Sequence, residues 1–350
     1  MLMAELTKQD KEQINWAGIE DLVREQFPDL QGDFQVEKFS AGYSNLTYKI
    51  RVGDWEAVLR RPPFGSIPPK AHNMEREFQL LMNIHPVFSL APEPYLYKED
   101  SSLMDKHFYL MEVKDGIVID DTLPDSYEKM DGIRPVISEA VIDSLVHLHS
   151  IDIKENNLMD LGKPEGFLER QVNGWIKRYN RAKTSEIEGV EEIEDWLLEN
   201  IPSSPEPTIV HNDFKLNNML FSSSHPGEVT GVFDWELCTV GDPLTDLGST
   251  LAYWTEPGDE ETGLSSVTEQ PGFLSREQML KLYEEKSGRD LSHIDYYLVF
   301  SFYKIAGILQ QIYDRWKNGS IEDDRFSSLD VGIRNLMKKA QQSRENPLRV

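Results

Sequence analysis

The eight residues HNDFKLNN, at positions 211–218, restrict the possible folds of this chain more than any other segment. Sixteen residues after Asn218, the apolar stretch GVF leads into Asp234. The order is H-x-D-x-x-x-x-N, then a short hairpin, then an apolar strand that ends in an aspartate. A single Asp or Asn in a loop is usually a turn or capping residue, so the information lies in the joint pattern.

Phosphoryl transfer explains each polar position of this pattern. The reaction needs a carboxylate that orients a hydroxyl and accepts its proton, oxygen ligands for Mg²⁺, and a cation near the transferred group. Asp213 fits the first role and Lys215 the last. Asn218 and Asp234 fit the magnesium ligands, because Mg²⁺ takes oxygen donors.

Residues 34 to 113 show the alternation of short β-strands, with one helix among them. Gly53-Asp54 separates two of the strands and is typical of a hairpin turn. The expected strands are FQVEKFS, NLTYKIRV, WEAVLRR and HFYLMEV, and the expected helix is AHNMEREFQLLMNI.

After Asp115 the pattern becomes mainly helical. The segment RPVISEAVIDSLVHLHS has an apolar stripe made of Val136, Ile137, Val141, Leu145 and Leu148. Further helices are expected at GFLERQVNGWIKRYNRA, IEDWLLENI, REQMLKLYEEK and SHIDYYLVFSFYKIAGILQQIYDRW, the last buried on several sides, and short strands at IVHND and TGVFDW. The chain is therefore predicted to be α+β and bilobal, with a small β-sheet lobe over residues 1–113 and a large helical lobe over residues 114–350.

The net charge and the cysteine count limit the kinds of partner and the cellular compartment that we expect for this chain. The formal net charge is −25, which disfavours nucleic acid and anionic membrane surfaces. The single cysteine, Cys238, excludes an intramolecular disulfide and fits a reducing cytoplasm. The polar start MLMAELTKQDKEQ and the short apolar runs predict a soluble, cytoplasmic protein, and nothing in the sequence indicates an oligomeric state.

The segments HNDFKLNN and GVFDWELCTVGDPLTDLG resemble the aminoglycoside phosphotransferase family, a branch of the protein-kinase fold. In particular they are similar to the kinase-like domain found in or beside acyl-CoA dehydrogenase family members. The resemblance runs from about Phe34 to Trp316 and is most specific from His211 to Asp246. It implies a protein-kinase-like fold that uses ATP and Mg²⁺.

The resemblance also implies roles for single residues. Asp213 matches the catalytic base, and Asn218 and Asp234 match the two magnesium ligands. Lys215 matches the lysine of the protein-kinase catalytic loop. Structural roles, in holding the loop or capping the following helix, are expected for His211, Asp242 and Asp246.

The loop SAGYSN, at residues 40–45, lies where kinases place the loop that covers the phosphates. It holds one glycine, Gly42, rather than the G-x-G-x-x-G of protein kinases. An ordinary turn is the alternative, but the resemblance to the family's G-x-S-N pattern favours phosphate contacts by Ser44 and Asn45.

Arg60 stands where protein kinases have the lysine of V-A-I-K. An arginine can hold phosphate oxygens bidentately, so the replacement is chemically reasonable, although a solvated strand face is the alternative. Glu77 is its expected partner on the following helix, with Glu75 as the other candidate. Glu112 and Val113 would form the hinge whose backbone meets adenine.

A protein kinase has a long activation segment after its magnesium aspartate, whereas here GDPLTDLG begins a few residues after Asp234. This leaves no room to dock a peptide and predicts a small-molecule hydroxyl acceptor. The acidic residues 256–261 either attract a cationic substrate or form a solvated loop. Cys238 is expected to be a packed small residue.

The predicted function is transfer of the ATP γ-phosphate to a hydroxyl of a small metabolite, such as a hydroxy-acyl compound or an aminosugar. The acceptor pocket is expected from the helices between 166 and 200 and the long C-terminal helix. The alternative is a catalytically silent nucleotide-binding regulator. This alternative stays open because Arg60 replaces the usual strand lysine. A metallohydrolase using His211 and Asp213 lacks further histidines at ligand spacing.

Overall fold

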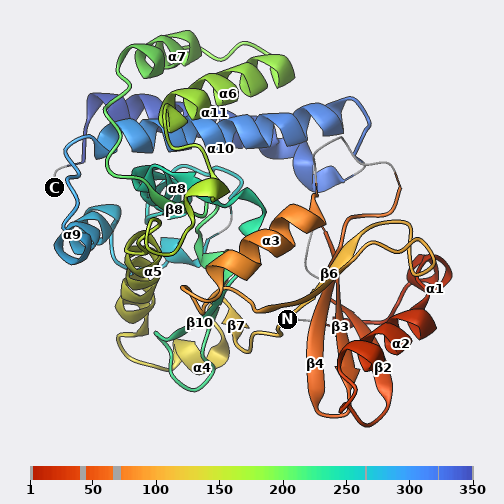
Figure 1. Ribbon diagram of the computed structural model, residues 1–350. Helices are drawn as coiled ribbons and strands as arrows, with labels where there is room; N and C mark the ends of the chain where they lie inside the picture. The colour runs from red at the N-terminus through yellow and green to blue at the C-terminus, as the bar shows by residue number, and fades with distance from the viewer. Residues whose placement is uncertain (1–2, 40–44, 66–71, 265, 322, 349–350) are drawn as a thin grey trace. The chain divides into compact units, whose positions relative to one another are not determined.

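The structure is a computed structural model that describes residues 3–39, 45–65, 72–264, 266–321 and 323–348 (Figure 1). It divides into two compact units. The first contains Met1–Val118 and Thr230–Glu236, and the second contains Ile119–Val229 and Leu237–Val350. The sequence placed a boundary after residue 113 and assigned Asp234 to the helical lobe, whereas in the structure Asp234 belongs to the sheet-containing unit.

Six strands of the described residues form an antiparallel sheet in the first unit, in the order β1-β2-β3-β4-β6-β5. The predicted hairpin joins β3 to β4, with Val52 opposite Trp55. Gly53 is required in its turn, because φ is +60° and a Cβ atom would lie 2.2 Å from the carbonyl oxygen of Gln31. The strands are β1 (Met3–Ala4), β2 (Phe34–Phe39), β3 (Leu46–Val52), β4 (Trp55–Arg61), β5 (Pro94–Lys98) and β6 (Phe108–Met111).

Two strands of this sheet were not predicted, β1 and β5. β5 begins at a proline, which cannot donate to the ladder, and its pairing with β6 shifts register between Pro94 and Leu96. β1 has only two residues. Neither segment carries the regular alternation by which a strand is found in sequence.

Three helices complete the description of the first unit: α1 (Lys8–Gln13), α2 (Trp16–Gln26) and α3 (Met74–Ile84). α2 buries Ile19 and Val23, four residues apart on one face, in a core shared with sheet residues such as Tyr48 and Ile50. α3 begins at Asn73, whose side chain accepts a hydrogen bond from the backbone N–H of Arg76. The predicted helix is therefore present.

The second unit is mainly helical, as predicted. Its helices are α4 (Asp125–Glu128), α5 (Ile133–His149), α6 (Phe167–Ala182), α7 (Val190–Glu199), α8 (Pro243–Tyr253), α9 (Arg276–Ser287), α10 (Ile294–Lys317) and α11 (Leu329–Glu345). β8 (Thr208–Val210) pairs antiparallel with β11 (Thr239–Gly241). The remaining short strands in the described part of the chain are β7 (Ile117–Val118), β9 (Met219–Phe221) and β10 (Val229–Val232).

α10 is the central helix of the second unit (Figure 1). It runs beside α11 and α6 and also packs on α8. Nearly every residue from Ile294 to Gln310 is buried, which confirms the prediction from its apolar residues on all sides.

The apolar stripe predicted for α5 is correct except at one position. Ile137, Val141, Leu145 and Leu148 are fully buried, whereas Val136 is 42% exposed. The helix is buried on more than one side, through small residues such as Ala140 as well as the stripe, so its burial does not follow a single apolar face.

Among the described residues, no helix combines the length and the apolar character needed to cross a membrane.

Candidate active site

The predicted catalytic loop leaves β8 and enters a 3₁₀ turn, Leu216–Asn218, before β9. Two backbone N–H groups at its start bind the carboxylate of Asp246, on α8. His211 N lies 2.5 Å from Oδ2, and Asn212 N lies 2.6 Å from Oδ1. Burial raises the pKa of Asp246, but the hydrogen bond and charge of His149 and the backbone bond outweigh it and lower the pKa. Asp246 therefore braces the loop, as predicted.

Asp242 caps α8. Its Oδ1 accepts from the backbone N–H of Leu244 at 3.0 Å, and its Oδ2 accepts from the hydroxyl of Tyr297 at 2.7 Å. This confirms the predicted capping role.

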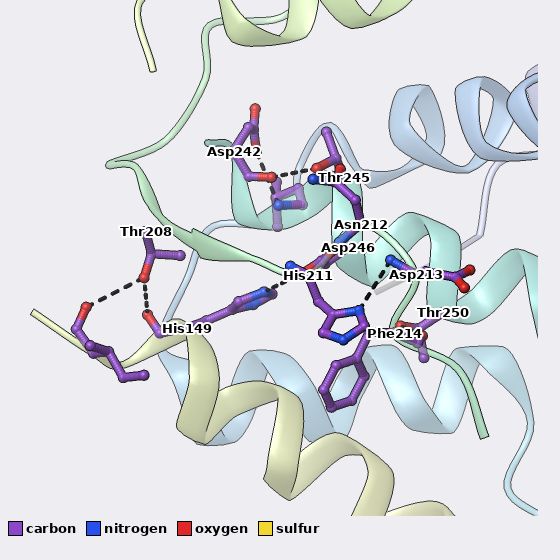
Figure 2. A network of polar contacts seen from close by, with 12 residues as sticks. His149, Thr208, His211, Asn212, Asp213, Phe214, Asp242, Thr245, Asp246 and Thr250 are labelled. Carbon is purple, nitrogen blue, oxygen red and sulfur yellow. Dashed lines mark hydrogen bonds and ion pairs between the residues drawn. The ribbon is translucent and has the colours of Figure 1, made fainter. Parts of the chain in front are cut away.

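His211 lies buried beneath the loop. Its Nδ1 accepts a hydrogen bond from the backbone N–H of Asp213 at 3.3 Å, and its ring meets the edge of Phe214 with centroids 5.7 Å apart. The hydroxyl of Thr250 donates to the carbonyl of Phe214 at 2.7 Å (Figure 2). The backbone on both sides of Asp213 is thus held by buried groups.

The structure brings Asp213, Lys215 and Asn218 together. Nδ2 of Asn218 donates to the backbone carbonyl of Asp213 at 2.9 Å and to its Oδ2 at 2.8 Å. Nζ of Lys215 lies 3.1 Å from the same Oδ2 and 4.9 Å from the ring centre of Tyr253. Because both bonds from Asn218 use its nitrogen, its amide oxygen remains available as a ligand. Tyr253 was not predicted, since only the fold brings it to Lys215.

Arg60 lies at the centre of the corresponding cluster in the first unit. Its Nε lies 3.1 Å from Glu77 on α3, and its Nη2 lies 3.0 Å from Oδ1 of Asp234. Glu75 is exposed, so Glu77 is the partner. Burial would lower the pKa of Arg60, but the carboxylates of Glu77 and Asp234 raise it.

The alternative of a solvated strand face is wrong for both strand arginines. Arg60 is largely buried, and Arg61 is fully buried. Arg61 pairs with Asp105 at 2.8 Å and lies 4.1 Å from the ring centre of Phe64.

Asp234 follows β10 with a left-handed backbone, φ +61°. Such a conformation costs a residue other than glycine about 1–2 kcal/mol, so neighbouring contacts must hold it. The buried Trp235 supplies one, because its Nε1 donates to the carbonyl of Val232 at 2.7 Å. The carboxylate of Asp234 itself is 43% exposed and accessible to a ligand.

Asn45 is the part of the predicted phosphate loop that the structure describes, while Gly42 and Ser44 lie outside the described residues. Its Nδ2 lies 3.3 Å from a carboxylate oxygen of Glu236, and its Oδ1 lies 2.8 Å from His72. Glu236 and His72 were not predicted, although the position of Glu236, two residues after Asp234, is a signal that could have indicated it.

The predicted hinge continues from β6. The backbone N–H of Glu112 donates to the carbonyl of Glu93 at 2.8 Å. A base that met Glu112 would therefore use its carbonyl oxygen. The contact of adenine with Glu112 and Val113 stays a prediction.

The two predicted magnesium ligands belong to different units, Asn218 to the second and Asp234 to the first. In the described part of the chain, no group of three or more His, Cys, Asp or Glu side chains forms a metal site by itself. An amide oxygen and an accessible carboxylate suit Mg²⁺, which usually completes its shell with phosphate oxygens and water. The donor types therefore fit this ion.

Three of the four acidic residues in segment 256–261 form ion pairs within the second unit, among them Glu260 with Lys338. Arg276 lies 2.7 Å from Glu256 and 2.5 Å from Asp259, and Lys339 lies 2.6 Å from Asp259. Glu260 and Glu261 are exposed, which agrees with the predicted solvated loop, and no cationic substrate is needed to explain the paired residues. Cys238 is fully buried, as expected.

Comparison with known proteins gives the family. The model of the family described as "Phosphotransferase enzyme family" matches residues 35–268. Acyl-CoA dehydrogenase family member 11 of Mus musculus is 34% identical over 312 residues, which are 87% of this chain and 39% of that protein. The chain thus spans about two fifths of this curated relative.

Solved structures show the same fold. A Ralstonia eutropha protein, solved as a candidate aminoglycoside phosphotransferase, superposes with a TM-score of 0.81 at 28% identity, over 95% of this chain and 99% of that one. A mutant of aminoglycoside phosphotransferase APH(4)-Ia, in complex with ADP and hygromycin B, has a TM-score of 0.58 at 16% identity, over 93% and 98%. The predicted bilobal, kinase-like fold is confirmed. Because the family model covers more than half of the chain, this protein belongs to the phosphotransferase enzyme family.

Proposed function

We propose that this protein is a kinase that transfers the γ-phosphate of ATP to a hydroxyl group of a small metabolite. The observation that carries the proposal is the carboxylate of Asp213. It lies on a loop whose backbone is held by Asp246 and His211, and it contacts both Lys215 and Asn218. A base, a cation and an amide ligand in mutual contact suit phosphoryl transfer.

The contacts of Asp213 indicate different roles for its two carboxylate oxygens. Oδ2 already accepts from Asn218 and Lys215, so Oδ1 is the oxygen that would receive the proton of the acceptor hydroxyl. The acceptor oxygen forms a bond to the γ-phosphorus, the bond from that phosphorus to the bridging oxygen breaks, and ADP leaves. Lys215 would help to neutralise the charge on the transferred group.

Asn218 and Asp234 would hold Mg²⁺, which when bound would neutralise charge on the phosphates. Asp234 is paired with Arg60, so its metal role requires Oδ2 or an exchange of partners. Arg60 would then be able to contact phosphate oxygens, as an arginine does well. If Asp234 stayed paired with Arg60 and could not bind the metal, the protein would be the catalytically silent regulator instead.

Of the two acceptor classes, we favour a hydroxy-acyl compound over an aminosugar. Three of the four carboxylates in the acidic segment that would attract an aminosugar are already paired, with Arg276, Lys338 and Lys339. The name of the mouse relative, an acyl-CoA dehydrogenase family member, points to acyl compounds. A reducing cytoplasm is the compartment we propose, since the chain has one cysteine.

The test is to incubate the protein with ATP, Mg²⁺ and a panel of hydroxyl compounds that contains both classes, and to follow ADP. We expect ADP above the rate without acceptor. Asp213→Asn should lower kcat by about 10²–10⁴-fold while the Kd for ATP changes by less than about twofold. Asp143→Asn, the same change at an exposed site on α5, is the control.

Two results would contradict the proposal. ATP binding with no ADP formed from any acceptor would favour the silent regulator. Equal activity of wild type and Asp213→Asn would remove Asp213 as the base.

A further inference from the structure

Lys304 is a buried lysine in the middle of α10. It is 7% exposed, and its neighbours Tyr303 and Ile305 are also buried. An ammonium group in such surroundings is costly unless it is hydrogen-bonded or paired. A core helix can be built from apolar residues alone, so the group that this lysine contacts is informative.

The contact is the backbone of the predicted catalytic loop. Nζ of Lys304 donates to the carbonyl oxygen of Asn212 at 3.0 Å. That carbonyl belongs to the peptide group whose N–H is the N–H of Asp213, and this N–H donates to Nδ1 of His211. One peptide group, immediately before the predicted base, is thus held at both ends by side chains.

Asn212 itself needs such support. Its φ is +68°, a left-handed conformation that is strained for a residue other than glycine. Its N–H binds Oδ1 of Asp246 at 2.6 Å, and its Nδ2 donates to the carbonyl of Leu237 at 2.9 Å. With Lys304 on its carbonyl, the backbone N–H, the backbone carbonyl and the side-chain amide nitrogen of Asn212 all have a hydrogen-bond partner.

The charges around Lys304 agree with this geometry. Burial lowers the pKa of Lys304, while the carboxylates of Asp246 and Asp213 oppose the shift and the cations Lys215 and Arg178 add to it. Both carboxylates therefore favour the charged form of the lysine that binds the Asn212 carbonyl.

We propose that Lys304 is a positioning residue, which holds the Asn212 carbonyl and thereby fixes the direction in which Asp213 presents its carboxylate. The kinetic consequence rests on the proposed function, whereas the effect on the loop backbone does not.

Four variants separate the possible roles. Lys304→Met removes the ammonium group and keeps most of the volume. Lys304→Arg keeps a cationic donor, and Lys304→Gln keeps an N–H donor without the charge. Lys317→Met changes an exposed lysine on the same helix and serves as the control.

For Lys304→Met we expect kcat to fall about 10–100-fold, because a small displacement of a reacting group costs this much, while KM for ATP changes by less than about twofold. Lys304→Arg should recover kcat to within about threefold of wild type. Hydrogen exchange at the Asp213 amide should become faster in Lys304→Met and stay unchanged in Lys317→Met.

Wild-type exchange at the Asp213 amide in Lys304→Met would overturn the proposal. So would faster exchange throughout the second unit, which would make the lysine a general stabiliser. If Lys304→Met does not fold, Lys304→Leu provides the same comparison, because it also lacks a donor for the Asn212 carbonyl. If the wild type transfers phosphate to no acceptor, the proposed function fails, but the exchange measurement still decides whether Lys304 holds the loop.

Discussion

The two sets of predicted active-site residues are held by different kinds of contact. In the second unit, the loop that carries Asp213 is bound through its backbone to the buried carboxylate of Asp246. In the first unit, Asp234 is held by an ion pair with Arg60 and is 43% exposed. Buried backbone bonds are costly to break, whereas a partly exposed ion pair exchanges partners at little cost. We therefore expect the Asp213 loop to be set before a ligand arrives, and the Asp234 cluster to be the part that a ligand rearranges.

Removal of the buried carboxylate should have the largest effect on stability. Asp246→Ala leaves the backbone N–H groups of His211 and Asn212 without their acceptor, so we expect the free energy of unfolding to fall by about 3 kcal/mol. Urea unfolding measures this change. Asp143→Ala, at a side chain that is 52% exposed and paired with Lys286, should cost less than about 1 kcal/mol. Equal urea midpoints for Asp246→Ala and wild type would remove the distinction between the two sites.

Asp234→Asn should mainly weaken ligand binding, with a smaller change in the free energy of unfolding than Asp246→Ala. Stability should stay within about 1 kcal/mol of wild type, because Asp234 is partly exposed and the largely buried Arg60 keeps Glu77 as its partner. Affinity for Mg²⁺-ATP should fall at least about tenfold if Asp234 is a metal ligand. Calorimetric titration with and without Mg²⁺ measures this, and ATP binding in EDTA is the internal control. A variant that binds Mg²⁺-ATP as tightly as wild type would show that Asp234 is not a ligand.

The smallest expected effect is a pH dependence of the free energy of unfolding, caused by His149, which contacts Asp246. Burial lowers the pKa of His149 and outweighs the opposing effect of Asp246, so the folded state binds its proton less well than the unfolded state, where the pKa is about 6.5. Its stabilising contribution is present above about pH 6.5 and is lost as pH falls from there through the folded-state pKa. The slope is at most about 1.4 kcal/mol per pH unit.

Urea midpoints between pH 8 and pH 5 measure this slope. His149→Gln should flatten it, and His107→Gln, at a half-exposed histidine in the first unit, should not. The lowered pKa of Asp246 contributes only as pH falls below about 4, so it does not interfere in this range. Parallel curves for wild type and His149→Gln would contradict the assignment.

Much of this arrangement was predictable because its signals are local. The alternation in NLTYKIRV and WEAVLRR, with Gly53 between them, predicted the hairpin that the structure shows. The likeness to the protein-kinase lysine and its helix glutamate predicted Glu77 as the partner of Arg60, with Glu75 as the alternative, and the structure shows Glu77. Asp242 stands directly before a proline and a helix, where a capping aspartate is expected.

Other features could not be predicted from the sequence, because they depend on residues that are distant along the chain. β5 becomes a strand through its pairing with β6, despite its proline. The acidic residues 256–261 had the appearance of a free charged surface until Arg276 and Lys339 were found beside them. Val136 fits the stripe of α5 in sequence, but it lies on a face that nothing covers completely.

By itself, the sequence predicted phosphoryl transfer, a sheet lobe followed by a helical lobe, and the strands and helices with a clear hydrophobic period, because motif spacing and hydrophobic period can be read along the chain. Only the tertiary structure decided that Asp234 pairs with Arg60 in the first unit and that Lys304 binds the carbonyl before Asp213. These contacts join residues 174 and 92 positions apart. The sequence does not indicate which backbone group a charged residue on a core helix will contact, because only folding brings the two together.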